Sequence, residues 1–416
     1  MVKCRISDSE AQDVFSLGEL YVSDFVSSDA TRPAVKSDLT LCLSPKSKLL
    51  QLKDTFSAGS LYGRYWYRSG TNLSMRLALK DVVDSVLLRK RMDRNAVWLD
   101  IASNDGTLLR FVPGNLVRIG IDPAEDSFKE EALKYADDVV QDFFSADIFR
   151  RSTYGFRKAD VVTVVAMFYD LDDPGKFLRD VSEIMDDDGL LVLQMSYTPL
   201  MIQQLAFDNI CHEHICYYSL TSLKYLLEEN GFQIVDCELN DVNGGSFRAY
   251  IKKDIADVKS FKTGPFRDVA NFRIQSLLEY EEVNGFNTIE RYEQFYKDIV
   301  ELKKSTVEFI LEEHGKGKVI WGYGASTKGN TLLQWYGLDH TVITAIAERS
   351  PYKHGLKTVG TDIPIESELD MRKEKPDYLL VLPWHFIEEF KNREEEYLKS
   401  GGAFIVPCPK FEVIRG

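Results

Sequence analysis

Apolar runs and amphipathic stretches alternate along the middle of this chain. The runs at 97–101, 116–121, 159–165 and 189–195 are rich in Val, Ile and Leu, which predicts strands buried on both faces of a sheet. The stretch 74–93 instead carries its apolar residues at helical spacing, which predicts a helix packed on that sheet. Strands that alternate with helices are typical of an α/β fold with a parallel sheet.

Two expected strands close this region, at 232–239 and 246–251, and only Asn243-Gly244-Gly245 and a few residues beside them separate the two. A gap this short joins neighbouring antiparallel strands, whereas a parallel pair needs a longer crossover. A βαβαβ series that ends in such a pair is the arrangement of a class I methyltransferase sheet, which is Rossmann-like.

The regions on either side have a different pattern. Residues 1–75 hold short apolar runs broken by Ser, Asp, Pro and Gly, which predicts short strands and turns. From 253 the chain is charged and helical, and a strand at 318–323 then leads through a Gly-rich turn into a second α/β unit. We therefore expect a small irregular N-terminal domain (1–75), a methyltransferase-type domain (76–252), and a helical arm with a C-terminal Rossmann-like domain (253–416).

A carboxylate ends each of the first two strands of the central series, Asp100 and Asp122, and a loop of small residues follows Asp100. Ligands of open α/β sheets bind beyond the carboxyl ends of the strands, and small residues let the backbone approach a ligand. Asp122 is placed to accept the hydroxyls of a ribose, and Asp100 suits a cationic group. The loop lacks G-x-G-x-x-G, so S-adenosylmethionine is favoured over a dinucleotide, with an ordinary βαβ crossover as the alternative. The residues expected to contact this cofactor are Asp100, Ala102, Ser103, Asn104, Gly106, Asp122, Asp142, Phe143, Ala166 and Met167.

Composition narrows the class of partner. The net charge of −14 argues against nucleic acid or an anionic membrane surface, because both are bound by basic proteins. No apolar stretch reaches the length of a membrane span, and the acidic first 20 residues do not resemble a secretory signal. The six scattered cysteines fit free thiols in a reducing cytoplasm.

The strongest local signal for chemistry is Cys211-His212-Glu213-His214, which holds two of the six histidines. Metal ligation is disfavoured, because the H-E-x-x-H spacing is not met and no nearby cluster completes a ligand set. A structural histidine pair remains an alternative to acid–base chemistry. Imidazole titrates near neutrality, and a flanking carboxylate can orient it, so we favour a catalytic acid or base here and expect no metal.

Two more stretches are candidates for ligand contact. Residues 62–72 read YGRYWYRSGTN. Either the tyrosines and arginines of this stretch face a polar ligand, or they pack the N-terminal region against the next domain. The turn at 322–329 reads GYGASTKG and opens a helix, where free N–H groups and the helix dipole favour phosphate. Lys328 adds a positive charge to that turn.

With these segments in view, nearly the whole chain resembles the sugar C-methyltransferase family of deoxysugar biosynthesis. The matching motifs, in order, are YRSG (67–70), SNDGTLL (103–109), DNICHEH (208–214), YYSL (217–220), NGGSFR (243–248), GYGASTKG (322–329), and PW and PCP segments near the C-terminus. Members combine a zinc-binding N-terminal domain, a central S-adenosylmethionine fold and a C-terminal Rossmann-like domain that helps to hold the nucleotide sugar.

The resemblance implies a reaction and a set of residues. The substrate would be a nucleotide-activated 4-keto-deoxyhexose, whose ketone acidifies the neighbouring C3–H. His214 would remove that proton, and Tyr65 or Tyr67, His212 and Glu213 would steady the ketone and enolate oxygen. The residues expected to bind the substrate are Asn243, Ser246, Arg248, Ser326 and Lys328.

The chain also departs from this family, whose members carry two Cys-x-x-Cys pairs in the N-terminal domain. Here Ser7 stands at the partner position of Cys4, and Pro45 stands at the partner position of Cys42. Two sulfurs cannot fill a tetrahedral site, so we expect zinc to be absent or weakly bound. An O-methyltransferase with the same cofactor, or a protein that binds the cofactor without catalysis, remains an alternative function.

Overall fold

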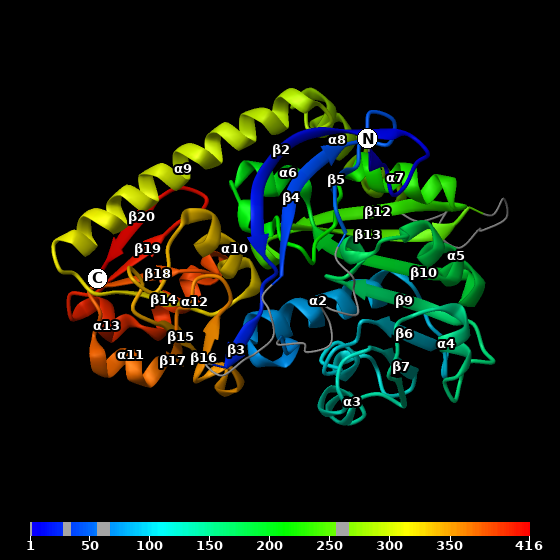
Figure 1. The fold of residues 1–416 in the computed structure, drawn as a ribbon. Coiled ribbons are helices and arrows are strands. Elements are labelled where there is room, and N and C mark those ends of the chain that lie inside the picture. The colour runs from blue at the N-terminus through cyan, green and yellow to red at the C-terminus, as the bar shows by residue number, and fades with distance from the viewer. Residues whose placement is uncertain (1, 28–34, 56–66, 255–265) are drawn as a thin grey trace.

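The computed structural model of the chain describes residues 2–27, 35–55, 67–254 and 266–416 (Figure 1). Three large sheets follow one another along the chain, with five, seven and six strands. Among the described residues, no helix is long and apolar enough to cross a membrane.

The N-terminal sheet has the order β1-β2-β4-β5-β11. Its strands are β1 Val2–Lys3, β2 Glu10–Tyr21, β4 Lys36–Leu43, β5 Leu50–Leu52 and β11 Cys216–Tyr217. Strand β2 is 12 residues long, so the expectation of only short strands in this region was wrong. Alternate residues Leu39 and Leu41 of β4 are fully buried, and this period of two buries one face of the ribbon.

The central sheet has the order β12-β13-β10-β9-β6-β7-β8. Its strands are β6 Val97–Ile101, β7 Val117–Ile121, β8 Asp138–Val140, β9 Ala159–Val165, β10 Met185–Ser196, β12 Phe232–Asn240 and β13 Ser246–Lys253. The first five strands pair in parallel, and β13 pairs antiparallel with both β10 and β12. This confirms the predicted class I methyltransferase fold. Because β6 lies between β7 and β9, the strand order reverses there, which opens a crevice at the carboxyl ends of these strands.

Helices cover this sheet on both sides. They are α2 Leu73–Arg89, α3 Asp126–Ala132, α4 Ala146–Arg150, α5 Pro174–Ile184, α6 Thr198–Gln203 and α7 Leu220–Glu229. The helix expected directly after β6 is only the 3-10 turn Leu109–Phe111. Pro113 explains this difference, because a residue before proline avoids the helical region, and Val112 is indeed extended, with ψ of 131°.

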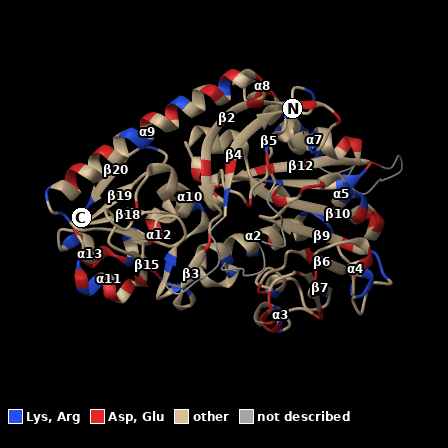
Figure 2. Cartoon of the chain, in the orientation of Figure 1, with Lys and Arg blue, Asp and Glu red and all other residues tan. Residues whose placement is uncertain are grey.

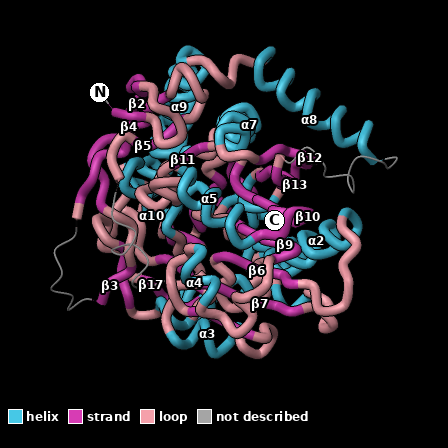
Figure 3. Tube along the Cα trace, turned by 90° about the vertical axis from the view of Figure 1, so that its right-hand side faces the viewer, coloured by secondary structure: helices cyan, strands magenta, loops and turns pink. Residues whose placement is uncertain are grey.

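The C-terminal third begins with α8 Phe266–Val283 and α9 Ile289–Gly315, and α9 runs over the top of the molecule from the central sheet to the last one (Figure 1). Lys, Arg, Asp and Glu alternate along the outside of α9 (Figure 2), as expected for a solvated helix face. In the view of Figure 3, α8 lies at the edge of the molecule beside α7.

The last sheet has the order β17-β15-β14-β18-β19-β20. Its strands are β14 Ile320–Tyr323, β15 Ile346–Glu348, β17 Ile365–Ser367, β18 Tyr378–Val381, β19 Ala403–Val406 and β20 Glu412–Arg415, and its helices are α10 Thr327–Tyr336, α11 Glu368–Glu374, α12 Ile387–Arg393 and α13 Glu395–Lys399. All its pairs are parallel except the last, which gives the second Rossmann-like unit that the Gly-rich turn predicted.

Two strand pairs join segments that are far apart in the sequence. Strand β11, from the middle of the chain, pairs with β5. Strand β3, Phe25–Ser27, pairs with β16, Leu356–Thr358, as a separate two-stranded sheet. The N-terminal region is therefore paired, through β5 and β3, with segments of both the central and the C-terminal parts of the chain.

Candidate active site

A cavity of about 410 Å³ opens at the carboxyl ends of β6, β7, β9 and β10. It takes lining residues from the central sheet, from the turn before β11 and from the C-terminal unit. Among the residues singled out from the sequence, it is lined by Tyr67, Asp100, Ala102, Ser103, Asn104, Asp122, Phe143, Ala166, Met167, Glu213, His214, Asn243, Ser246, Ser326 and Lys328.

Asp100 lies at the floor of this cavity, where it is 4% exposed. Its Oδ1 accepts a hydrogen bond of 2.6 Å from the Thr163 hydroxyl on the neighbouring strand. Burial raises its pKa to about 7, and the negative charge of Asp122 adds to the rise. A cationic ligand group would restore the charged carboxylate, because an opposite charge favours the ionised form.

Asp122 organises the loop that follows β6. Its two carboxylate oxygens accept hydrogen bonds of 2.8 Å from the backbone N–H groups of Asn104 and Ala124. Each oxygen has a second lone pair, so the carboxylate can still accept ligand hydroxyls. The Ser103 hydroxyl is buried in the same loop and has no hydrogen-bond partner among the described residues.

The segment that contains Tyr67 docks directly on this loop. The Asn104 side chain accepts from the Ser69 N–H at 3.0 Å and donates to the Tyr67 carbonyl at 3.0 Å. The Gly70 N–H donates to Asp105 at 2.8 Å. These bonds hold Tyr67 at the cavity wall. Tyr65 lies outside the described residues.

These residues fit S-adenosylmethionine. The buried Asp100 and the half-buried Asp122 suit its cationic amino group and its ribose hydroxyls, and Phe143 and Met167 supply aromatic and thioether surface for a nucleobase. An unpaired buried hydroxyl such as that of Ser103 is costly unless a ligand or water bonds to it.

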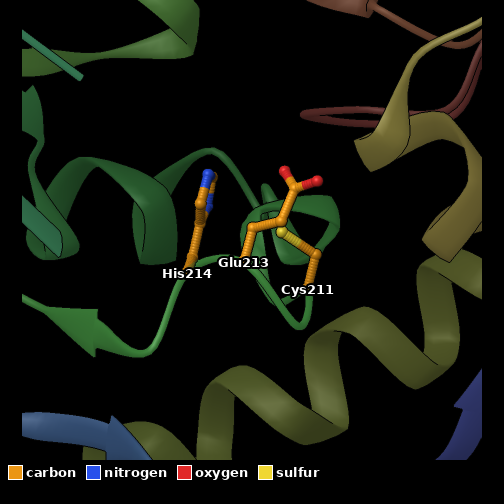
Figure 4. A group of neighbouring side chains, drawn as sticks. All are labelled: Cys211, Glu213 and His214. Atoms are coloured by element: carbon orange, nitrogen blue, oxygen red, sulfur yellow. The ribbon is translucent and has the colours of Figure 1, made fainter. Parts of the chain in front are cut away.

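The second part of the cavity is formed by the turn 211–214, which lies between a 3-10 helix and β11 (Figure 4). His214 Nδ1 lies 3.0 Å from the Asn209 carbonyl oxygen, which can only accept, so Nδ1 carries the proton and Nε2 has a free lone pair. The Tyr169 ring packs edge-on against the imidazole at 4.4 Å and orients it. Burial and the positive charge of Lys328 lower the His214 pKa to about 3, so the ring is neutral at physiological pH.

Glu213 lines the cavity beside His214. Burial raises its pKa to about 7, against the opposing effects of a hydrogen bond from the Thr327 hydroxyl and of the Lys328 charge. The carboxyl can therefore hold or release a proton near neutral pH.

The Cys211, Glu213 and His214 side chains also have ligand atoms within 4.8 Å of one another, and among the described residues they form the one group of this kind. The ammonium of Lys328, whose charge reaches all three, would repel a metal cation there. The geometry thus favours a proton-transfer site over a metal site.

The structure corrects the expected role of His212. Its side chain turns away from the cavity, and Nε2 lies 3.1 Å from the Ser37 carbonyl oxygen on β4. It thereby fixes the turn to the N-terminal ribbon and does not line the cavity.

Arg248 is a second correction, because it is 1% exposed and lies outside the cavity wall. Its guanidinium donates to Asp81 at 2.8 Å and to Glu238 at 3.0 Å, which makes it a structural ion pair between α2, β12 and β13. It therefore has no N–H directed at a sugar.

Gly106 and Asp142 also differ from expectation, since neither lines the cavity. A Cβ on Gly106 would lie 2.6 Å from the Ala132 Cα, so this glycine permits close packing against α3. The Asp142 carboxylate faces Arg151 at 3.3 Å.

Sequence patterns did not reveal that residues after β18 reach the cavity. Pro383, His385 and Phe386 line it together with Thr327. Burial and the Lys328 charge lower the His385 pKa to about 3. The one feature of the sequence that could have indicated this contact is His385, since histidines are rare in this chain and His385 directly follows the PW pair.

The N-terminal cysteines do not fit zinc. The structure gathers Cys4, Ser7, Ser44 and Ser47: the Cys4 Sγ lies 3.2 Å from the Ser47 hydroxyl, and the Ser7 and Ser44 hydroxyls are 3.5 Å apart. The Cys42 thiol does not join this group, and it donates to an aspartate on β2. One thiol among hydroxyls is not a structural zinc ligand set.

Comparison with known proteins adds the class of chemistry. Residues 73–236 match the family model described as "Methyltransferase domain", and residues 241–409 match "C-methyltransferase C-terminal domain". The chain is similar to C-methyltransferase NovU of Streptomyces niveus, with 29% identity over 367 residues, which cover 88% of this chain and 85% of NovU. The cavity takes residues from both matched ranges.

Two solved structures each match less than half of this chain. The plantazolicin methyltransferase BpumL in complex with SAH covers 43% of this chain and 83% of its own, with 11% identity and a TM-score of 0.35. Magnesium protoporphyrin IX methyltransferase (ChlM) from Synechocystis PCC 6803, with bound SAH, covers 45% and 90%, with 12% identity and a TM-score of 0.35.

Proposed function

We propose that this S-adenosylmethionine-dependent methyltransferase transfers a methyl group to the carbon beside the ketone of a nucleotide-activated 4-keto-deoxyhexose. The match to a C-methyltransferase C-terminal domain and the similarity to NovU support carbon as the acceptor. The motif resemblance to sugar C-methyltransferases supports the class of substrate.

The observation that carries the proposal is the state of His214. Its ring is neutral, its tautomer is fixed by the Asn209 carbonyl, and it lines the same cavity as Asp100 and Asp122. A neutral imidazole with a free Nε2 is a general base, and the acidic hydrogen beside a ketone is what such a base removes.

The remaining residues hold the reactants in place. Asp100 and Asp122 bind and orient the cofactor, which when bound supplies an electrophilic sulfonium methyl group. Glu213 and Tyr67 line the wall where the ketone would lie, and they exclude water from the carbanion. Fixing base, carbon and methyl group in one cavity supplies much of the rate, because it removes the entropic cost of bringing them together.

The first test uses a panel of nucleotide-activated 4-keto-deoxyhexoses in D₂O. We expect deuterium to enter beside the ketone, and we expect a methyl group on that carbon when the cofactor is present, both measured by NMR. Methylation of a hydroxyl group without exchange would indicate the O-methyltransferase alternative. Cofactor binding with no exchange and no methylation of any sugar would reject the proposal.

The second test replaces the base. His214→Gln should lower both exchange and turnover by about 10²–10⁴-fold, since it removes general base catalysis. The affinity for S-adenosylmethionine, measured by calorimetry, should stay unchanged. His340→Gln is the matched control, because His340 is exposed and outside the cavity wall. Wild-type turnover in His214→Gln would remove His214 from the mechanism.

A further inference from the structure

Lys328, from the C-terminal unit, reaches the segment 209–214 that contains His214. It lies near the start of α10, and its Nζ donates a hydrogen bond of 2.5 Å to the Asn209 Oδ1. The backbone carbonyl of the same Asn209 accepts from His214 Nδ1. One residue therefore joins the ammonium group to the base.

The ammonium charge shifts the pKa values of several titratable groups near it. It lowers the pKa values of His214 and His385, and it opposes the rise that burial causes at Glu213 and Asp208. Within the described ranges, no carboxylate lies at ion-pair distance from Lys328, whose bonded partner is a neutral amide. The charge is thus close to the base and not neutralised by a contact.

The low pKa of His214 creates a chemical requirement. A base that holds a proton weakly can deprotonate carbon only if the anion that forms is strongly stabilised. In a 4-keto sugar, C3 loses the proton and the negative charge of the anion lies on the ketone oxygen. That oxygen is bonded to C4, the carbon next to C3. A cation or another hydrogen-bond donor beside the base would supply this stabilisation, and Lys328 is the ammonium group joined to the base through Asn209.

The sequence suggested instead that Lys328 binds phosphate. In a 4-keto pyranose the diphosphate is attached at C1, across the ring from C4, whereas the carbon that reacts is next to C4. A lysine joined through Asn209 to the base would lie on the ketone side of a ring whose reacting carbon faces His214. The helix start itself offers Ser326 to the cavity, but its hydroxyl already accepts from the Gly329 N–H at 3.0 Å.

We propose that Lys328 is a catalytic residue, whose ammonium donates a hydrogen bond to the ketone oxygen and stabilises the enolate; this rests on the proposed function. The C–H bond breaks, the proton moves to His214 Nε2, and the electron pair of that bond forms the carbon–carbon double bond. The carbonyl electron pair moves to the oxygen, and Lys328 keeps its three protons. The C-terminal unit then contributes directly to the chemistry.

The test compares Lys328→Met with Lys328→Arg and with the exposed control Lys373→Met on α11. We expect Lys328→Met to lose about 10²–10³-fold in kcat and in deuterium exchange at saturating substrate, as when an oxyanion donor is removed. Lys328→Arg should recover part of the loss. Binding of a nucleoside diphosphate alone, which carries phosphate and no ketone, should be unchanged in all three variants.

The contrary results are distinct. If Lys328→Met weakens binding of the nucleoside diphosphate and raises KM while exchange at saturation stays normal, Lys328 is a phosphate ligand and the proposal is wrong. If the wild-type enzyme exchanges no keto sugar, the proposed function fails and the role of Lys328 fails with it. In Lys328→Met the His214 pKa, measured by NMR titration, should rise, because the charge that lowers it is gone.

Discussion

Three residues with left-handed backbone meet at the wall of the cavity. Ala102, Asn104 and Ala166 have φ of 59°, 51° and 55°. Such a backbone costs a non-glycine residue of the order of 1–3 kcal/mol, so it persists only where neighbouring contacts impose it. The hydrogen bond from the Asn104 N–H to Asp122 is one of these contacts. The strain lies where the chain leaves β6 and β9, next to the expected cofactor.

Asp100 should make stability depend on pH. Its pKa of about 7 in the folded protein lies above the ordinary value of 3.8, so the folded chain binds more protons between these values. Stability therefore falls as the pH rises through this window. Asp100→Asn removes the charge and should unfold at a higher temperature than wild type above pH 7, with little difference near pH 4.

Thermal unfolding of the apoprotein between pH 4 and 8 measures this effect, with the exposed Asp126→Asn as the control. The same Asp100→Asn variant should bind S-adenosylmethionine more weakly, because the carboxylate for its cationic amino group is lost. If the difference in unfolding temperature between Asp100→Asn and wild type stays constant across this pH range, Asp100 is ionised in the folded protein.

At the scale of elements, Glu281 joins α8 to the start of α7. It is fully buried, and its carboxylate accepts from the N–H groups of Leu220 and Thr221 and from the Tyr197 hydroxyl, at 2.6, 2.9 and 2.6 Å. A negative charge also interacts favourably with the N-terminal end of a helix. Glu281→Ala should lower the free energy of unfolding by about 3 kcal/mol or more, because each buried donor left unpaired costs about 1–3 kcal/mol.

Denaturant unfolding measures this loss. Glu282→Ala is the control, because it removes an exposed carboxylate from the next position of the same helix. Equal stability of the two variants would show that water replaces the Glu281 carboxylate at no cost.

At the scale of the whole molecule, Trp384 connects the C-terminal unit to the 3-10 helix Phe207–Asn209, which precedes the turn 211–214. Its indole Nε1 donates to Asp208 Oδ2 at 3.1 Å, and the other oxygen of Asp208 has no hydrogen-bond partner in the described part of the chain. Trp384→Phe keeps an aromatic ring but removes the donor. We expect kcat/KM for the sugar to fall about tenfold, since losing one partner of a buried carboxylate costs about 1–3 kcal/mol.

Steady-state kinetics and calorimetry separate the two substrates in this variant. The affinity for S-adenosylmethionine should stay unchanged, because its expected contacts lie on the central sheet. Trp335→Phe makes the same change at another buried tryptophan of the C-terminal unit and should leave kcat/KM near wild type. A loss of cofactor affinity in Trp384→Phe would show that the two units are more closely coupled than this contact implies.

Apart from the helix expected after β6, the sequence by itself determined which segments of the central domain form strands and helices, and it placed Asp100 and Asp122 at strand ends. Both follow from local patterns, since buried strands are continuous apolar runs and the ends of parallel strands meet at one edge. The cluster around His214 was visible for a similar reason, because histidines are rare in this chain.

Only the tertiary structure decided which side chains of that cluster face the cavity. Residues two apart on a strand share a face. Here, however, the chain forms a turn, in which the backbone N–H of His214 donates to the Cys211 carbonyl at 3.1 Å. This turn directs the His212 side chain to β4 and the His214 side chain to the cavity. The approach of Lys328 and His385 from the C-terminal unit likewise depends on contacts between segments more than one hundred residues apart, such as Lys328 with Asn209. Local periodicity records which face of an element is apolar, and it carries no information on which distant element covers that face.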